Sequence, residues 1–209
     1  MKVIVFGATG SVGRLAVLRL LKDGHQVTAF ARRAENLDLR HSALTIWSGD
    51  ATDRDAVFEA VKGQDAVVIT LGAGMSRASI VRSQGTLTII QAMQAHGVRR
   101  LVCQTTLGTH ESWGNLNFFW KRIMFGLLLR PVLRDHELQE SLVRASGLDW
   151  TIVRPGAFTD GPSGSGYKEG FGPEVRGLNL KIPKADIASF LSRQLSDGRY
   201  LGKAVSISC

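Results

Sequence analysis

The chain has 209 residues, of which 44% are hydrophobic and 21% are charged. This balance is typical of one soluble globular domain. The formal net charge is +8, but the basic residues are dispersed and no nucleic-acid-binding motif accompanies them. We therefore do not expect a nucleic-acid partner.

The cysteines and the apolar runs indicate in which cellular compartment the protein is expected. Two cysteines, Cys103 and Cys209, are too few for a disulfide framework, which favours a reducing, cytoplasmic location. Cys103 lies in an apolar run and is predicted to be a core residue. The first apolar run is short and leads into glycine, which is not typical of a signal peptide. The longest run, Ile123–Leu129, is too short to span a bilayer.

The N-terminal segment is the most informative one. The β-branched run Lys2–Phe6 predicts a buried parallel strand, and Arg14–Lys22 predicts a helix. Between them, Gly7, Gly10 and Gly13 recur at three-residue spacing. The first amides of a helix lack intrahelical partners and lie at the positive end of its dipole, so this unit predicts a pyrophosphate site. Because the spacing is GxxGxxG rather than GxGxxG, a glycine-rich turn without a ligand is the alternative.

Strand-like and helix-like segments alternate along the rest of the chain. The further predicted strands are Gln26–Ala31, Leu44–Ser48, Ala66–Leu71, Arg100–Thr105, Trp150–Arg154 and Ala204–Ser208. The further predicted helices are Arg54–Lys62, Ser79–His96, Asn117–Ala145 and Ala185–Leu195. This alternation predicts an α/β fold with a doubly wound parallel sheet. The glycine-rich segment Ser163–Gly177 is predicted to be a surface loop.

Ligands of such folds bind at the carboxyl ends of the strands, where this chain places two arginines. Arg32 and Arg33 follow the second predicted strand, where NAD-preferring enzymes usually carry an acidic residue. Two guanidinium groups suit the 2′-phosphate of NADP(H) better, although strand-end arginines are also found as solvated charges. Two interpretations of Asp50 stay open: it accepts from the adenine amino group, or it caps the helix that begins near Asp53.

The predicted cofactor residues lie in the glycine turn and just after the strands. They are Gly7, Thr9, Gly10, Ser11, Val12, Gly13, Arg32, Arg33, Gly49, Asp50, Ala51, Leu71, Gly72, Ala73, Thr105 and Pro155. The two glycines of Leu71–Gly74 let the backbone approach a ribose or nicotinamide, or else form a plain turn. We predict no metal site.

Several segments resemble the atypical short-chain dehydrogenase/reductases. They are GATGSVG at the N-terminus, GQDAVVITLG (Gly63–Gly72), AHGVRRLV (Ala95–Val102) and SGLDWTIVRPG (Ser146–Gly156). The nearest branch is that of the biliverdin-IXβ and flavin reductases, with the NmrA-like proteins close by. The resemblance covers nearly the whole chain. It implies a Rossmann-like fold that binds NADPH, in a single domain over residues 1–209. A small C-terminal part is expected to cover the substrate, and the substrate-covering elements are expected at about 107–135 and 155–183.

The same resemblance implies two candidate catalytic residues. Thr106 matches a serine at the end of the fifth strand, beside the nicotinamide. His136 matches the histidine of an Asp-His pair that opens the next long helix, where it shapes the pocket or relays a proton. Ordinary polarity on a helix surface is the alternative for His136.

The chain departs from typical short-chain dehydrogenases in its tyrosines. Tyr167 and Tyr200 carry Phe171 and Ala204 where a Tyr-x-x-x-Lys pair needs lysine, so alcohol oxidation through such a pair is not expected. Hydride transfer to a flat, conjugated acceptor of the flavin, quinone or tetrapyrrole type needs little acid–base help and is the expected function. The alternative is a non-catalytic NADP(H)-binding redox sensor, or a regulatory or assembly protein of the NmrA-like kind.

One segment fits the resemblance poorly. Residues Trp113–Leu133 carry closely spaced aromatic and aliphatic side chains on several faces of the predicted helix. Four interpretations are open for it: packing against the sheet, an aromatic cover over a flat substrate, a homodimer face, or contact with a membrane surface.

Overall fold

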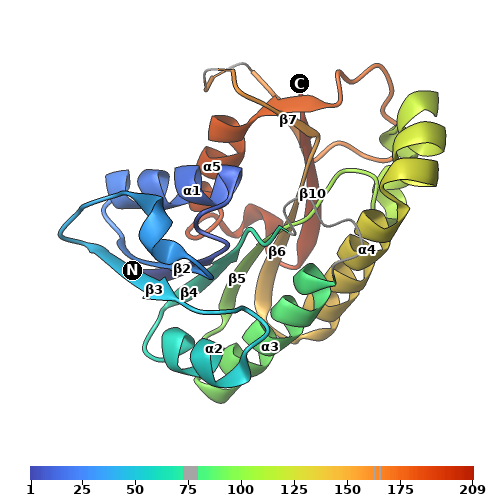
Figure 1. Cartoon of the computed structure of the whole chain (residues 1–209). Coiled ribbons are helices and arrows are strands. Elements are labelled where there is room, and N and C mark those ends of the chain that lie inside the picture. The colour runs from blue at the N-terminus through green and yellow to red at the C-terminus, as the bar shows by residue number, and fades with distance from the viewer. Residues whose placement is uncertain (73–79, 162, 165) are drawn as a thin grey trace.

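The computed structural model describes residues 1–72, 80–161, 163–164 and 166–209. Its centre is an eight-stranded sheet with the strand order β3-β2-β1-β4-β5-β6-β10-β8 (Figure 1). The strands are β1 (Lys2–Phe6), β2 (Gln26–Ala31), β3 (Leu44–Ser48), β4 (Ala66–Ile69), β5 (Arg100–Gln104), β6 (Asp149–Pro155), β8 (Lys168–Glu169) and β10 (Lys203–Ser208). All neighbours pair in parallel except β8, which is antiparallel to β10.

Helices cover both faces of this sheet, as a parallel sheet requires. One face packs against α1 (Ser11–Lys22) and α5 (Lys184–Arg193), and the other against α2 (Arg54–Val61), α3 (Val81–Ala95) and α4 (Arg130–Ala145) (Figure 1). The central strands are apolar on both sides because each side contacts helices. The predicted Rossmann-like, doubly wound fold is confirmed.

The predicted helix Asn117–Ala145 is wrong as a single element. The chain forms a π-helical segment, η3 (Trp120–Leu128), and then begins α4 at Arg130. Leu129 between them leaves helical geometry, with φ of −118°. Pro131 stands in the first turn of α4, where its missing N–H costs nothing, but it cannot continue a preceding helix. Among the described residues, none of the helices has the length and apolar character needed to cross a membrane.

The segment predicted as a plain surface loop adds an edge strand to the main sheet, and a small two-stranded sheet flanks it. The segment contains β8, and around it β7 (Ala157–Thr159) pairs with β9 (Lys181–Pro183). Asn115, at the end of the 3-10 helix η2 (His110–Asn115), donates to the carbonyls of Gly172 and Val175 at 2.8 and 3.1 Å. The two regions predicted to cover a substrate therefore contact each other. That covering role stays a prediction.

The turn between β1 and α1 brings two stretches of backbone unusually close. Gly7 has φ of +84°, and a Cβ there would lie 2.5 Å from the carbonyl oxygen of Thr70 at the end of β4. A Cβ at Gly13 would lie 2.2 Å from the carbonyl oxygen of Gly7. Both distances are shorter than real carbon–oxygen contacts, so only glycine lets α1 begin where it does.

This contact gives a first prediction. Gly13→Ala should lower the free energy of unfolding by about 1–3 kcal/mol, because the new methyl group must displace the first turn of α1. Urea denaturation measures the change. Gly198→Ala is the matched control, since a Cβ at Gly198 meets nothing within 4 Å; it should change stability by less than about 0.5 kcal/mol. Equal stability of the two variants would contradict the prediction.

Candidate functional site

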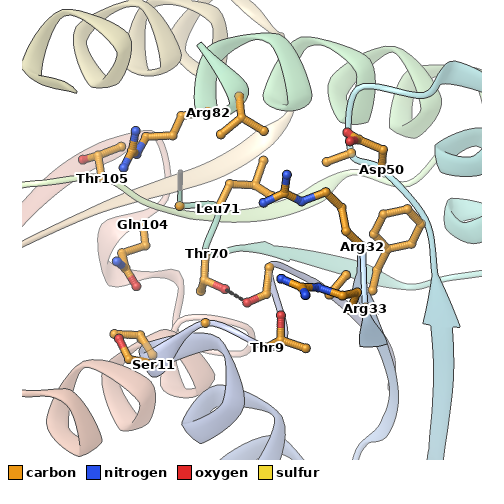
Figure 2. Close-up of a pocket in the computed structure, with 18 of the residues that line it drawn as sticks. Thr9, Ser11, Arg32, Arg33, Asp50, Thr70, Leu71, Arg82, Gln104 and Thr105 are labelled. Carbon is orange, nitrogen blue, oxygen red and sulfur yellow. Dashed lines mark hydrogen bonds between the residues drawn. The ribbon is translucent and has the colours of Figure 1, made fainter. Parts of the chain in front are cut away.

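A cleft of about 670 Å³ runs along the carboxyl ends of the parallel strands (Figure 2). It holds most of the predicted site residues. Those that line it are Gly7, Thr9, Gly10, Ser11, Val12, Arg32, Arg33, Gly49, Asp50, Ala51, Leu71, Gly72, Thr105, Thr106 and His136. Gly13 lies beneath the glycine turn, and Pro155 lines a neighbouring cavity. Ala73 lies outside the described residues.

One wall of the cleft is the N-terminus of α1. Gly10 is the N-cap residue, no side chain caps the helix, and the first turn carries no acidic residue. Ser11 and Val12 line the cleft there, so their amides are available to an anion at the positive end of the helix dipole. The hydroxyl of Thr70 donates to the carbonyl of Phe6 at 3.0 Å, which ties the end of β4 to the turn.

The outer end of the cleft is basic. Arg32 and Arg33 are exposed at the end of β2, and Figure 2 shows both side chains reaching over the cleft. Asp50 accepts from the amide and the hydroxyl of Thr52 at 2.9 and 2.8 Å, and these bonds hold its pKa below the usual value. Asp53, not Asp50, caps α2 by accepting from two amides of its first turn. The capping interpretation of Asp50 is therefore wrong.

The inner end of the cleft is closed by polar side chains from several elements. Gln104 ends β5, Thr105 and Thr106 follow it, and Arg82 comes from the first turn of α3. In Figure 2 the Arg82 guanidinium lies beside Thr105, at the opposite end from Arg32. The cleft thus joins a basic outer end to a polar inner end, with the α1 N-terminus between them.

His136 is buried and lines the inner end, so it is not a surface residue. Its Nδ1 lies 3.0 Å from Gln139 Oε1, while Gln139 Nε2 donates to the hydroxyl of Thr86 at 3.0 Å. Since the amide nitrogen of Gln139 is used by Thr86, its oxygen is left to accept from His136 Nδ1–H. Burial, followed by the charge of Arg82, lowers the pKa of His136 to about 4. The imidazole is therefore neutral near pH 7.

Asp135, the neighbour of His136, has a structural task. It accepts from the amides of Arg82 and Ser83 at 3.3 and 3.0 Å and from the Ser83 hydroxyl at 2.6 Å. A carboxylate of α4 thus caps the N-terminus of α3 in place of a local cap, which that helix lacks. The pair Asp135-His136 lies one turn inside α4 rather than at its start, so the expected position of the pair is corrected.

A buried ion pair that the sequence analysis missed supports the inner end. Glu140 and Arg154 are almost inaccessible and meet in two bonds, Nε to Oε1 at 2.9 Å and Nη2 to Oε2 at 2.5 Å. The hydroxyls of Thr105 and Thr109 also donate to Oε1, at 2.8 and 2.6 Å. Burial alone would raise the pKa of Glu140, but the bonds and charge of Arg154 outweigh it and the pKa is lowered. The Thr105 hydroxyl therefore donates its hydrogen to Glu140 in the protein interior rather than to a ligand in the cleft.

A second, smaller cavity of about 40 Å³ adjoins the inner end and shares Thr106 with the cleft. Its other lining residues are mostly apolar: Leu107, Leu116, Trp120, Phe125, Pro155, Gly156, Ala157 and Leu180. Thr106 is therefore the polar group between the nucleotide-sized cleft and an apolar cavity.

The two tyrosines lie away from the cleft. The hydroxyl of Tyr200 donates to Glu169 at 3.2 Å, and the ring of Tyr167 packs on Phe190 of α5. Burial is the largest cause that raises the pKa of both phenols. Neither lines the cleft, in agreement with the missing Tyr-x-x-x-Lys pair.

Several residues that line the cleft were not predicted. They are Phe30, Ala31, Asn36, Thr70, Val81, Arg82, Gln104 and Phe158. Thr70 and Gln104 each stand one residue before the end of a predicted strand; the strands of the structure end earlier, at Ile69 and Gln104, which brings both residues to the cleft. Phe158 lies just after the predicted strand Trp150–Arg154, so the rule that ligands bind at strand ends pointed to its segment. Arg82 carried no signal in one sequence, because tertiary packing brings it to the cleft.

Comparisons with known proteins place this site in a family. A family model described as NAD(P)H-binding matches residues 7–198. UPF0659 protein YMR090W of Saccharomyces cerevisiae is 28% identical over 93% of this chain and 87% of its own length. The 3-diazoavenalumate denitrifying reductase of a Streptomyces species is 30% identical over 91% and 68%.

The structural comparison agrees. ChuY, an anaerobillin reductase from Escherichia coli O157:H7, matches with a TM-score of 0.80 and 23% identity over 100% of this chain and 97% of its own, a likeness that shows a shared fold. Because the family model spans nearly the whole chain, the protein belongs to the NAD(P)H-binding family of atypical short-chain dehydrogenase/reductase type.

Proposed function

We propose that this protein is an NADPH-dependent reductase that transfers hydride to a flat, conjugated acceptor of the flavin, quinone or tetrapyrrole type. The observation that carries the proposal is a single cleft with a basic outer end, a helix N-terminus in its middle and a polar inner end beside an apolar cavity. Two of the proteins compared above are named as reductases, which supports reduction as the reaction class.

The residues of the cleft fit an adenine dinucleotide. Gly7 and Gly13 let the β1–α1 turn pack closely on itself and on Thr70, and this packing leaves the bare amides at the start of α1 facing the cleft, where a diphosphate can reach them. Arg32 and Arg33 present guanidinium groups where a 2′-phosphate is expected, which favours NADPH over NADH. When bound, the reduced nicotinamide supplies the hydride.

The inner end fits an acceptor that needs little acid–base catalysis. His136 is neutral near pH 7 and its Nδ1–H is used by Gln139, so its Nε2 can accept a hydrogen bond but cannot act as a proton donor. Glu140 is ionised and held by Arg154, and the Thr105 hydroxyl is held by Glu140. A delocalised acceptor does not need a proton donor from these side chains, because solvent can supply its proton after hydride transfer. In this proposal Thr106 and His136 orient the acceptor.

An assay of purified protein tests the proposed function. NADPH should be oxidised in the presence of FMN, a naphthoquinone or a linear tetrapyrrole, with loss of the nicotinamide absorbance and dependence on enzyme concentration. Tight NADPH binding without turnover across this panel would overturn the reductase and favour the second candidate, a non-catalytic NADP(H)-binding sensor or assembly protein. Among the described residues of the inner end, His136 is neutral and Glu140 is ionised near pH 7, so neither is a protonated acid, and this favours the second candidate.

The arginines give a prediction on cofactor choice. Arg32→Ala with Arg33→Ala should weaken NADPH binding at least about tenfold and leave NADH binding within about twofold, because only the 2′-phosphate is lost as a partner. Calorimetry measures both affinities. Arg199→Ala with Lys203→Ala removes the same charge from exposed positions outside the cleft and serves as the control. An unchanged preference for NADPH in the first variant would show that the phosphate binds elsewhere.

His136 gives a prediction on stability and pH. The unfolded chain protonates this imidazole below its ordinary pKa of 6.5, but the folded chain does so only near a pKa of about 4. Lowering the pH from about 7.5 to 5 should therefore cost the native state about 2 kcal/mol through this group. His136→Gln should remove that share of the pH dependence in urea denaturation. His41→Gln, at an exposed histidine, is the control and should keep it.

A further inference from the structure

The π-helical segment carries apolar side chains that the fold leaves uncovered. Phe118 and Leu127 are each 74% exposed, and Phe119 is 50% exposed. Ile123 and Leu128 are exposed as well. Figure 1 shows η3 at the edge of the molecule, beyond the start of α4. We call these five side chains the η3 patch. Isolated exposed apolar residues are ordinary, but a contiguous group of this kind marks a contact surface.

The geometry of the segment explains why both of its sides are apolar. In a π-helix equivalent positions recur every four to five residues. Trp120, Phe125 and Leu129 follow this spacing and pack inward against the cluster that contains Leu107 and Leu116. Ile123, Leu127 and Leu128 fall between these positions, Phe118 and Phe119 directly precede Trp120, and all five side chains are exposed. Core packing, one of the four open interpretations, therefore accounts for the inward side only.

The charge of the segment distinguishes a homodimer face from a membrane-surface contact. Residues 112–134 contain Lys121, Arg122, Arg130 and Arg134 and no acidic residue. Arg122, Arg130 and Arg134 are exposed. In a symmetric dimer through this patch, each copy would bring these cations against the same cations of its partner, which is unfavourable. An anionic lipid surface meets both features at once, because it takes apolar side chains between its headgroups and attracts the flanking cations.

We propose that the η3 patch docks this protein on the surface of an anionic lipid bilayer. Phe118, Phe119 and Leu127 insert at the level of the headgroups, while Arg122 and Arg130 contact lipid phosphates. The contact is peripheral and reversible, and electrostatic attraction makes it sensitive to salt. It also places the docked segment directly over the cavity that shares Thr106 with the cleft, since the inward residues Trp120 and Phe125 line that cavity.

Vesicle sedimentation of the full chain tests the proposal. Vesicles of phosphatidylcholine with roughly a third phosphatidylglycerol should bind at least about ten times more protein than vesicles of phosphatidylcholine alone, and about 0.5 M salt should release most of it. Phe118→Ser with Leu127→Ser should abolish binding to both kinds of vesicle. Arg122→Gln with Arg130→Gln should abolish the preference for the anionic vesicles.

The control variant is Ile46→Ser with Leu201→Ser, which changes two exposed apolar residues outside the η3 patch and should bind vesicles as the unchanged protein does. Circular dichroism and NADPH affinity check that every variant is folded. The proposal is overturned if neither kind of vesicle binds the protein, or if the Phe118 and Leu127 changes leave binding intact. Light scattering that finds a dimer lost in the same variant, without vesicle binding, would assign the patch to a second copy instead.

Discussion

The close approach of the β1–α1 turn to the end of β4 is the constraint on which the site depends. The backbones of Gly7 and Gly13 lie so close to each other and to Thr70 that a Cβ at either glycine would overlap a backbone carbonyl oxygen. This contact fixes where α1 begins, and with it the direction in which the unpaired amides of Ser11 and Val12 point. An anion site made of backbone needs no charged side chain at its centre, so the chain can place its arginines at the periphery.

The inner end of the cleft is built differently, because two of its ionisable groups, Glu140 and His136, are held in fixed charge states by their surroundings. Glu140 is ionised and spends its oxygens on Arg154, Thr105 and Thr109. His136 is held neutral by burial and by the charge of Arg82. What remains at this end is the Arg82 guanidinium and a set of fixed dipoles next to an apolar cavity. Such an environment can orient a reactant and exclude water, but it contributes little to proton transfer.

The sequence predicted the parts of the molecule that depend on local pattern. The strand positions, the glycine turn and the basic end of β2 all follow from short apolar runs and from the residues after them. The Glu140–Arg154 pair was missed because the two residues lie in separate elements, although an arginine inside the apolar run before Pro155 was a signal. The π-helix was missed because its apolar spacing resembles that of an α-helix, and only Pro131 hinted at the break.

The buried pair also bears on how this family can change over time. Replacing Arg154 alone would leave the buried carboxylate of Glu140 without its main partner at a cost of about 3–5 kcal/mol, close to the whole stability of a marginal domain, whereas Arg154 without Glu140 would keep its ion pair with Glu111 at 3.0 Å. A substitution of Arg154 therefore needs a compensating change at Glu140, which constrains this corner of the molecule. The outer segments that surround it face no such barrier. In related chains that keep this pair, we accordingly expect substitutions to gather in the outer segments rather than in the scaffold beneath Thr105.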